Sequence, residues 1–147
     1  MTPEPKRKPF PWRCPKCLRK SVNPTRIPYE AQIKHDGRLY VVDVPALNVA
    51  KCDACGELVL DNRADEQITD ALRKQLGLLR PDQIRSRREA LNLTQKELAD
   101  RLGIASETVS RWETGALVQS RAMDNLIRLY FTLPEVRAVL SGEKRAS

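Results

Sequence analysis

The sequence predicts an α+β protein of two domains, a small β-rich domain followed by an all-α domain. All four cysteines lie in the first half, where they frame a strand-like hairpin. From residue 62 onward the apolar residues change to a helical spacing, which persists nearly to the C-terminus. The expected boundaries are a flexible basic arm at 1–12, the β-rich domain at 13–61, a linker helix at 62–79, the helical domain at 80–142 and a tail at 143–147.

The composition fits a folded protein with an anionic partner and excludes a membrane span. Hydrophobic residues make up 41% of the 147 residues and charged residues 31%, enough for a packed core. The longest apolar runs fall far below the roughly 18 residues of a membrane span, and the N-terminus lacks the apolar stretch of a secretory signal. We therefore expect a cytoplasmic protein with no membrane partner. The net charge of +7 suits a nucleic acid, although an ordinary solvated surface can be equally basic.

The arm at 1–12 combines prolines with the basic run Lys6-Arg7-Lys8. Such a composition buries little, so we expect a mobile, solubilising tail. A phosphate-contacting arm is the alternative.

The β-rich domain is predicted from a hairpin signal. Residues 29–33 and 38–44 are strand-like and flank Asp36-Gly37, a dipeptide typical of tight hairpin turns. A further short strand is expected at 58–60. His35, the only histidine, lies beside the turn, and we expect it to be exposed and not a metal ligand.

The four cysteines form two Cys-x-x-Cys pairs, Cys14 with Cys17 and Cys52 with Cys55. Two residues between thiolates let both sulfurs reach one ion, and two such pairs complete a tetrahedral shell. Because a four-sulfur shell leaves no open position, we predict one structural Zn²⁺ ion, with iron as the other possible metal. A thioredoxin-like redox pair is the alternative, but it would need a single pair in a βαβ context. Metal binding should supply the folding energy of so small a domain.

The second half reads as helix throughout. Ile68, Leu72 and Leu76 recur every four residues, and Gly77 follows as a stop signal. Pro81 is favourable at the first turn of a new helix. We expect five helices between there and Leu140.

Residues 95–114, QKELADRLGIASETVSRWET, have the spacing of a helix-turn-helix. Thr94 and Glu97 form a capping box that begins the first helix, and Gly103 supplies a left-handed corner. Ser106 is expected to cap the second helix, whose Val109 and Trp112 face inward. The pattern from about Pro81 to Leu140 resembles the Cro/C1-type helix-turn-helix of repressors.

This resemblance implies that the second helix enters the major groove of double-stranded DNA. The outward residues expected to meet base edges are Ser106, Glu107, Ser110 and Arg111. The residues expected on the phosphate backbone are Gln95, Lys96 and Thr114. Arg111 is suited to bidentate contact with guanine, and its alternative is an ion pair with Glu107 four residues away.

The two domains together resemble the MqsA (YgiT-type) antitoxins of bacteria. The shared elements, in order, are CPKC, RIPY, CDACGE, LTQKE and SRWETG. The resemblance implies a zinc module that holds a ribonuclease toxin and a C-terminal domain that dimerises and binds a palindromic operator in its own promoter. By position, the four zinc ligands fall on the four cysteines and the two base-reading residues on Glu107 and Arg111. Glu107 replaces an amide residue of the best-known member.

The leading interpretation is a zinc-stabilised, homodimeric repressor that acts as the antitoxin of its own operon. Dimerisation through the C-terminal helices is predicted from their apolar residues Leu126, Leu129, Leu133, Val136 and Leu140. The alternative is a stand-alone zinc-containing regulator, or a partner-docking module without a toxin. An enzyme is disfavoured, because the metal shell is closed, no histidine accompanies a nucleophile and no phosphate-binding loop is present.

Overall fold

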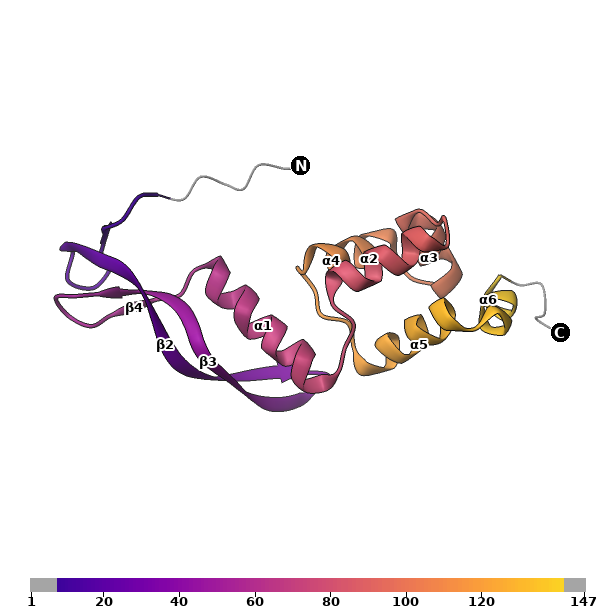
Figure 1. The fold of residues 1–147 in the computed structure, drawn as a ribbon, viewed down its shortest axis with the longest axis horizontal. Helices are drawn as coiled ribbons and strands as arrows, with labels where there is room; N and C mark the ends of the chain where they lie inside the picture. Colours follow the sequence, from indigo (N-terminus) through magenta and orange to yellow (C-terminus); the bar gives the residue numbers. More distant parts are fainter. Residues whose placement is uncertain (1–7, 142–147) are drawn as a thin grey trace. The chain divides into compact units, whose positions relative to one another are not determined.

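The computed structural model describes residues 8–141 of the chain. The expected basic arm lies partly, and the expected tail wholly, outside these residues. The described chain divides into two compact units, which are taken in turn below; residues 33–40, at the tip of the hairpin, group with the second. A four-stranded sheet is followed by a set of helices, so the predicted two-domain α+β class is confirmed (Figure 1).

The sheet is built on one long hairpin. Strands β2 (Lys20–His35) and β3 (Arg38–Cys52) are neighbours, and β1 (Trp12–Arg13) and β4 (Leu58–Val59) add short antiparallel edges, giving the order β1-β2-β3-β4. Asp36 and Gly37 both have positive φ, 52° and 72°, as the predicted tight turn requires.

Both hairpin strands are longer than predicted. Pro24 and Pro28 do not end β2, because β1 pairs only with its first residues, Lys20 and Val22. Among residues 8–141, one edge of β2 beyond that point has no neighbouring strand, and proline is tolerated at such an edge since no ladder partner is lost.

Helix α1 (Asn62–Leu76) lies along the hairpin (Figure 1). The Gln67 side chain fixes it there, because its Nε2 donates to Ala46 O at 3.3 Å and its Oε1 accepts from Asn48 N at 2.7 Å. Strand β3 supplies most of the buried residues of the first unit, and within it the pairs Val42/Val44 and Leu47/Val49 keep the two-residue spacing of a strand; Ala50 and Cys52 are also buried. Gly77, at φ 67°, follows the helix as predicted.

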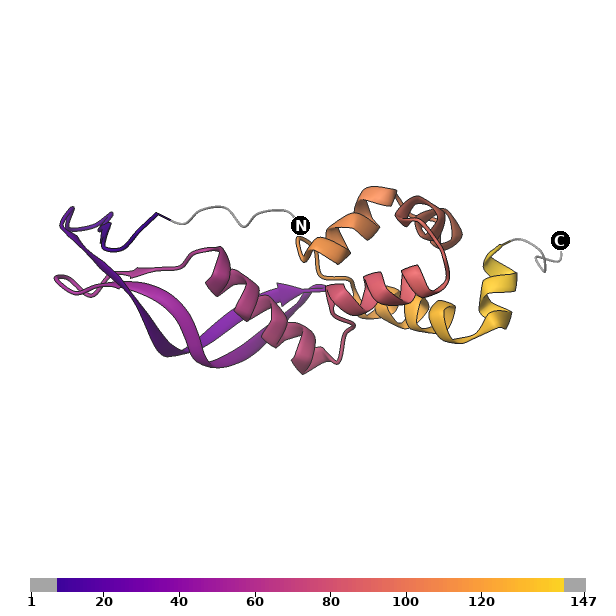
Figure 2. The same cartoon turned by 45° about the horizontal axis from the view of Figure 1, so that its top comes forward.

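The described part of the chain contains five further helices, as predicted: α2 (Pro81–Ala90), α3 (Gln95–Leu102), α4 (Ser106–Thr114), α5 (Arg121–Thr132) and α6 (Pro134–Leu140). Helix α4 packs on both α2 and α3, and α6 packs on α5 (Figure 2). Their common core consists of Leu79, Ile84, Leu98, Ala99, Val109, Trp112, Ile127 and Tyr130.

The segment between α1 and α2 is hydrogen-bonded to side chains of α5. Asp124 is buried, and its carboxylate accepts from Leu79 N at 2.8 Å and from Gln119 Nε2 at 3.0 Å. Arg128 pairs with the same carboxylate at 2.7 Å and donates to Gly77 O at 2.6 Å. Both oxygens of the buried Asp124 carboxylate therefore have hydrogen-bond donors, as a buried carboxylate requires.

The capping residues predicted for α3 and α4 agree with the structure, with one exception. Thr94 Oγ1 accepts from Glu97 N at 3.1 Å while the Glu97 carboxylate accepts from Thr94 N at 3.0 Å, which confirms the capping box. Gly103 is left-handed, with φ 75°. The predicted cap of α4 is wrong, because Ala105 holds the N-cap position and Ser106 is already the first helical residue.

Replacing Thr94 with Ala should lower the free energy of unfolding by about 1 kcal/mol, because the backbone N–H of Glu97, in the first turn of α3, loses its acceptor Thr94 Oγ1. Urea denaturation followed by circular dichroism at 222 nm measures this change. Thr132→Ala is the matched control, since Thr132 Oγ1 only donates to Arg128 O within its own helix. Equal effects of the two substitutions would contradict the capping role.

Candidate metal centre and nucleic-acid interface

The four cysteine sulfurs converge on one point. Their Sγ atoms all lie within 4.8 Å of one another, with Cys14–Cys55 and Cys17–Cys52 both at 3.6 Å. A tetrahedron with zinc–sulfur bonds of about 2.3 Å has edges of about 3.8 Å. The predicted ligand set is therefore assembled, with the spacing that a tetrahedral metal ion needs.

Two matching turns place these sulfurs, one between β1 and β2 and the other between β3 and β4. In the first turn Leu18 N donates to Cys14 O at 3.0 Å, and in the second Gly56 N donates to Cys52 O at 2.9 Å. Leu18 and Gly56 both have positive φ, 64° and 80°. The backbone N–H groups of Lys16 and Cys17 point at Cys14 Sγ, each at 3.4 Å.

Hydrogen bonds favour the thiolate form of two ligands. The N–H of Cys17 lowers the pKa of Cys14 against the effect of burial. The hydroxyl of Ser21, 3.1 Å from Cys52 Sγ, lowers the pKa of Cys52 to about 6. Since thiolates bind metal, Ser21 supports the site from outside the ligand set. Sequence reasoning missed Ser21, because only the pairing of distant segments brings it to Cys52.

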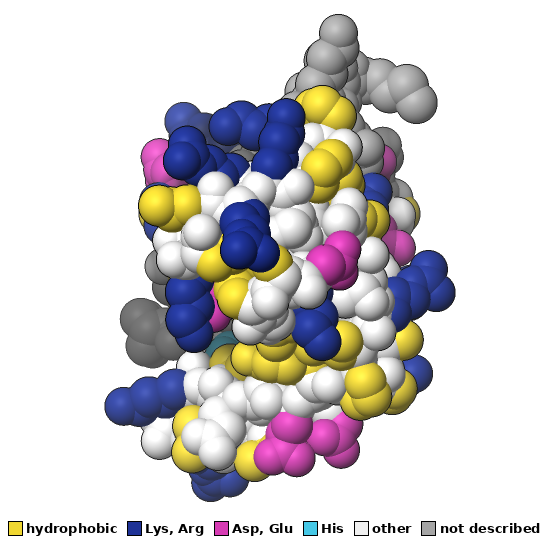
Figure 3. Space-filling view, turned by 90° about the vertical axis from the view of Figure 1, so that its left-hand side faces the viewer, with side chains coloured by type: hydrophobic (Ala, Val, Ile, Leu, Met, Phe, Trp, Pro, Cys, Tyr) yellow, Lys and Arg dark blue, Asp and Glu magenta, His cyan; other side chains and the backbone are white. Residues whose placement is uncertain are grey.

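The surroundings of the cluster are basic. A divalent ion with four thiolates would carry two negative charges. The two cysteine turns and the adjoining strand ends contain Arg13, Lys16, Arg19, Lys20 and Lys51 against Asp53 and Glu57, and Lys16 pairs with Glu57 at 3.8 Å. Lys and Arg side chains are prominent on this end of the molecule (Figure 3). This excess of cations would offset part of the charge of a metal tetrathiolate.

His35 is not part of the cluster, but the expectation that it is exposed is wrong. Its side chain is only 12% exposed, and Nε2 lies 3.6 Å from Asp36 Oδ2.

Replacing Cys52 with Ser should abolish metal binding, because three thiolates leave the tetrahedral shell incomplete. Elemental analysis of the purified protein should show one ion per chain for the natural sequence and about none for the variant. Ser21→Ala is the graded comparison, which should keep the ion but weaken its affinity by about tenfold or more. Full metal content in Cys52→Ser would refute the site.

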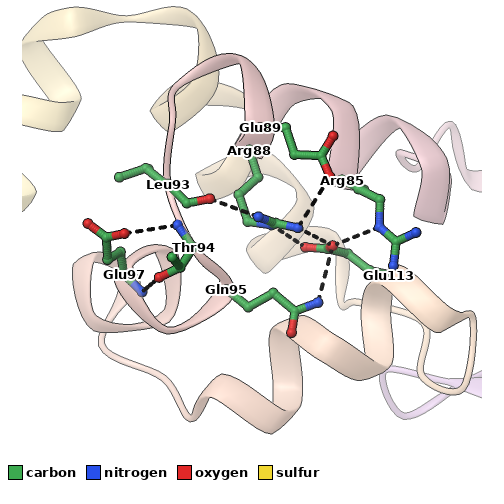
Figure 4. Close-up of polar contacts among 8 residues, drawn as sticks. All are labelled: Arg85, Arg88, Glu89, Leu93, Thr94, Gln95, Glu97 and Glu113. Atoms are coloured by element: carbon green, nitrogen blue, oxygen red, sulfur yellow. Dashed lines mark hydrogen bonds and ion pairs between the residues drawn. The ribbon is translucent and has the colours of Figure 1, made fainter.

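In the helical unit one buried carboxylate joins three helices (Figure 4). Glu113, in the last turn of α4, accepts from Arg88 Nε at 2.8 Å and from Arg88 Nη2 at 2.9 Å. Gln95 Nε2 and Arg85 Nε donate to its Oε1 at 3.3 and 3.4 Å. We call Arg85, Arg88, Gln95 and Glu113 the Glu113 cluster.

The cluster also fixes the turn between α2 and α3, because Arg88 Nη1 donates to Leu93 O at 2.8 Å. Burial raises the pKa of Glu113, but the hydrogen bonds from Arg88, Gln95 and Arg85 and the charge of Arg88 together outweigh this effect, and the net pKa is lowered. Sequence reasoning missed these partners. The available signal was that Glu113 follows Val109 by four residues and so shares its inward face.

The predicted DNA contacts lie on α4 and at the start of α3. Lys96, Glu107, Arg111 and Thr114 are exposed, whereas Gln95, Ser106 and Ser110 are half-buried. Val109 and Trp112 are buried, as expected. Within the described residues Glu107 and Arg111 form no ion pair, so the alternative interpretation of Arg111 is not realised in this structure.

A family model described as Helix-turn-helix matches residues 84–129. Residues 84–129 thus form a Cro/C1-type helix-turn-helix domain. Domains of this kind belong to DNA-binding transcriptional regulators, which agrees with the interface just described. No curated protein matches the chain. Among the described residues, no helix is both long and apolar enough to cross a membrane.

Replacing Glu113 with Gln should destabilise the helical unit by about 3–5 kcal/mol at neutral pH, because Arg88 is left buried without its counter-charge. Urea denaturation followed by circular dichroism measures this loss. Glu107→Gln, on the exposed face of the same helix, should change stability little. Equal stability of the two variants would show that the buried pair does not hold the helices.

The lowered pKa of Glu113 also predicts acid sensitivity. Stability from this group is complete above the unfolded pKa, near 4.5, and is lost as the pH falls through the lower folded value. The pKa of Glu97 is lowered in the same direction by hydrogen bonds from Thr94. In Glu113→Gln the free energy of unfolding should therefore fall less steeply as the pH is lowered than in the natural sequence. An equally steep fall would contradict the contribution of Glu113 to acid sensitivity.

Proposed function

We propose that the protein is a homodimeric transcriptional repressor that binds a palindromic operator through α4. In this proposal it is the antitoxin of a toxin–antitoxin pair, represses its own operon and binds a ribonuclease-type toxin through the metal-holding module. The observation that carries the proposal is the helix-turn-helix itself, with exposed polar residues on α4 over a buried apolar face.

Base reading is assigned to the outward face of α4. Arg111 is exposed and unpaired with Glu107 among the described residues, so its guanidinium is available for the two acceptors of guanine. Glu107, one turn earlier, is suited to accept from cytosine N4. Ser106 and Ser110 flank them.

Backbone contact is assigned to Gln95, Lys96 and Thr114. Lys96 is exposed in the first turn of α3, where a positive side chain can pair with phosphate. Thr114 ends α4, and its Oγ1 accepts from Ala116 N at 3.4 Å. These contacts set the orientation of α4 in the groove without reading sequence.

The dimer is supported by apolar residues that the unit leaves uncovered. Leu129, Leu133 and Val139 are 47, 40 and 44% exposed on or beside α5 and α6. Of the five residues predicted for the interface, Val136 and Leu140 instead pack on the core of their own unit. A symmetric dimer of helix-turn-helix units would read two half-sites about one helical turn apart.

The metal is proposed to be Zn²⁺, because four thiolates in a closed tetrahedral arrangement suit a structural zinc ion, with iron as the alternative. Leu39 and Val41 on β3 are exposed apolar residues, which fit a protein partner better than a polyanion. The second candidate function is a stand-alone zinc-containing regulator or a partner-docking module without a toxin. We further propose that the protein is not an enzyme and acts in the cytoplasm.

The metal-loaded protein should prefer its own upstream promoter region over a scrambled duplex by about a thousandfold or more. Arg111→Ala should weaken promoter binding by about 5- to 150-fold, the equivalent of 1–3 kcal/mol, with little effect on the scrambled duplex. Fluorescence anisotropy titrations at fixed physiological salt measure both quantities.

An equal loss on both duplexes would make Arg111 a phosphate contact. Equal weak binding of the natural sequence to both duplexes would refute the sequence-specific repressor and favour the partner-docking module.

A further inference from the structure

Arg85 is a surplus cation in the Glu113 cluster. Arg88 already contacts both carboxylate oxygens of Glu113, at 2.8 and 2.9 Å, and neutralises its charge. Arg85 adds one longer contact, Nε to Oε1 at 3.4 Å, and its side chain is 55% exposed while that of Glu113 is fully buried. A second guanidinium on a neutralised carboxylate contributes little stability, since exposed ion pairs are weak and two like charges repel.

The outer part of Arg85 is available to another molecule. Within the described residues its Nη1 and Nη2 atoms have no hydrogen-bond partner. The carboxylates close to the cluster are Glu113 itself and Glu89, which is 62% exposed and lies 3.9 Å from Arg88 Nη2. Arg85 therefore presents two N–H-bearing nitrogens to solvent from a position that the buried carboxylate fixes.

That position adjoins the proposed DNA-binding face. Gln95 Nε2 and Arg85 Nε donate to the same oxygen atom of Glu113 (Figure 4). The guanidinium of Arg85 therefore lies close to Gln95, which is itself a proposed phosphate contact. Glu113 itself lies beside Thr114 and two residues after Arg111 on α4. A planar guanidinium whose outer N–H donors face solvent suits the oxygens of a phosphate group.

We propose that Arg85 is a DNA-backbone contact, held by Glu113 so that it and Gln95 bind one stretch of phosphates at the edge of the groove that α4 enters. This inference rests on the proposed DNA-binding function and adds a helix, α2, to the interface. Arg85 supplies affinity without sequence preference, whereas Glu113 acts as a positioning residue.

The test compares three variants of the full-length, metal-loaded protein. Arg85→Gln removes the charge, Arg85→Lys keeps it, and Arg87→Gln removes an exposed arginine from the same helix that has no contact with Glu113. Binding to the promoter duplex and to the scrambled duplex is measured between about 50 and 200 mM salt. Urea denaturation of each variant reports the structural contribution separately.

Arg85→Gln should reduce the slope of log affinity against log salt by about 0.9 per bound protomer, on both duplexes. Counterion release then corresponds to about a fivefold loss per protomer near 0.15 M salt. Arg85→Lys should keep the slope, Arg87→Gln should change it less, and none should approach the destabilisation of Glu113→Gln.

An unchanged slope in Arg85→Gln, or an equal reduction in Arg87→Gln, would overturn the proposal. So would a loss of affinity that merely follows a loss of stability. If the natural sequence binds both duplexes equally, the specific repressor is refuted but the slope on the scrambled duplex still decides the role of Arg85. Absence of any DNA binding would refute both.

Discussion

The helical unit depends on the burial of one carboxylate. Burying the charged carboxylate of Glu113 away from water costs free energy. Hydrogen-bond donors from neighbouring helices must therefore compensate for its lost hydration. Arg88 comes from α2 and Gln95 from the first residue of α3, while Glu113 itself ends α4. The pair of helices that forms the DNA-binding motif is thus held by polar geometry as well as by the apolar core.

In the first unit, which contains the four cysteines, segments that are distant in sequence are also brought together by polar groups, here the cysteine thiols. Its two cysteine turns are separated by the whole β2–β3 hairpin, and the small apolar core cannot alone repay the entropy of bringing them together. A metal ion bound to the four thiolates would supply that free energy directly, and folding and metal binding would then form one equilibrium. Ser21 contributes by stabilising a thiolate before any ion arrives.

Features governed by neighbours in sequence could be predicted. The Asp36-Gly37 turn, the capping box at Thr94 and the left-handed Gly103 all depend on local backbone preferences. The spacing within each Cys-x-x-Cys pair likewise indicated that the four sulfurs would lie close together. Features that depend on distant segments could not be predicted. The strand ends required knowing that β1 pairs only with the start of β2, and the partners of Glu113 required the packed arrangement of three helices.

The hydrogen bonds between the segment after α1 and helix α5 determine where a stable fragment of the chain can begin. Leu79 N and Gly77 O are hydrogen-bonded to Asp124 and Arg128, and Gln119 completes the network. A fragment that starts at Pro81, the first residue of α2, would leave Asp124 and Gln119 with missing partners in the interior. A fragment that starts at Leu72 retains them all. To keep this network, the shortest autonomous DNA-binding piece of this chain must therefore start no later than Gly77, ahead of the first residue of α2.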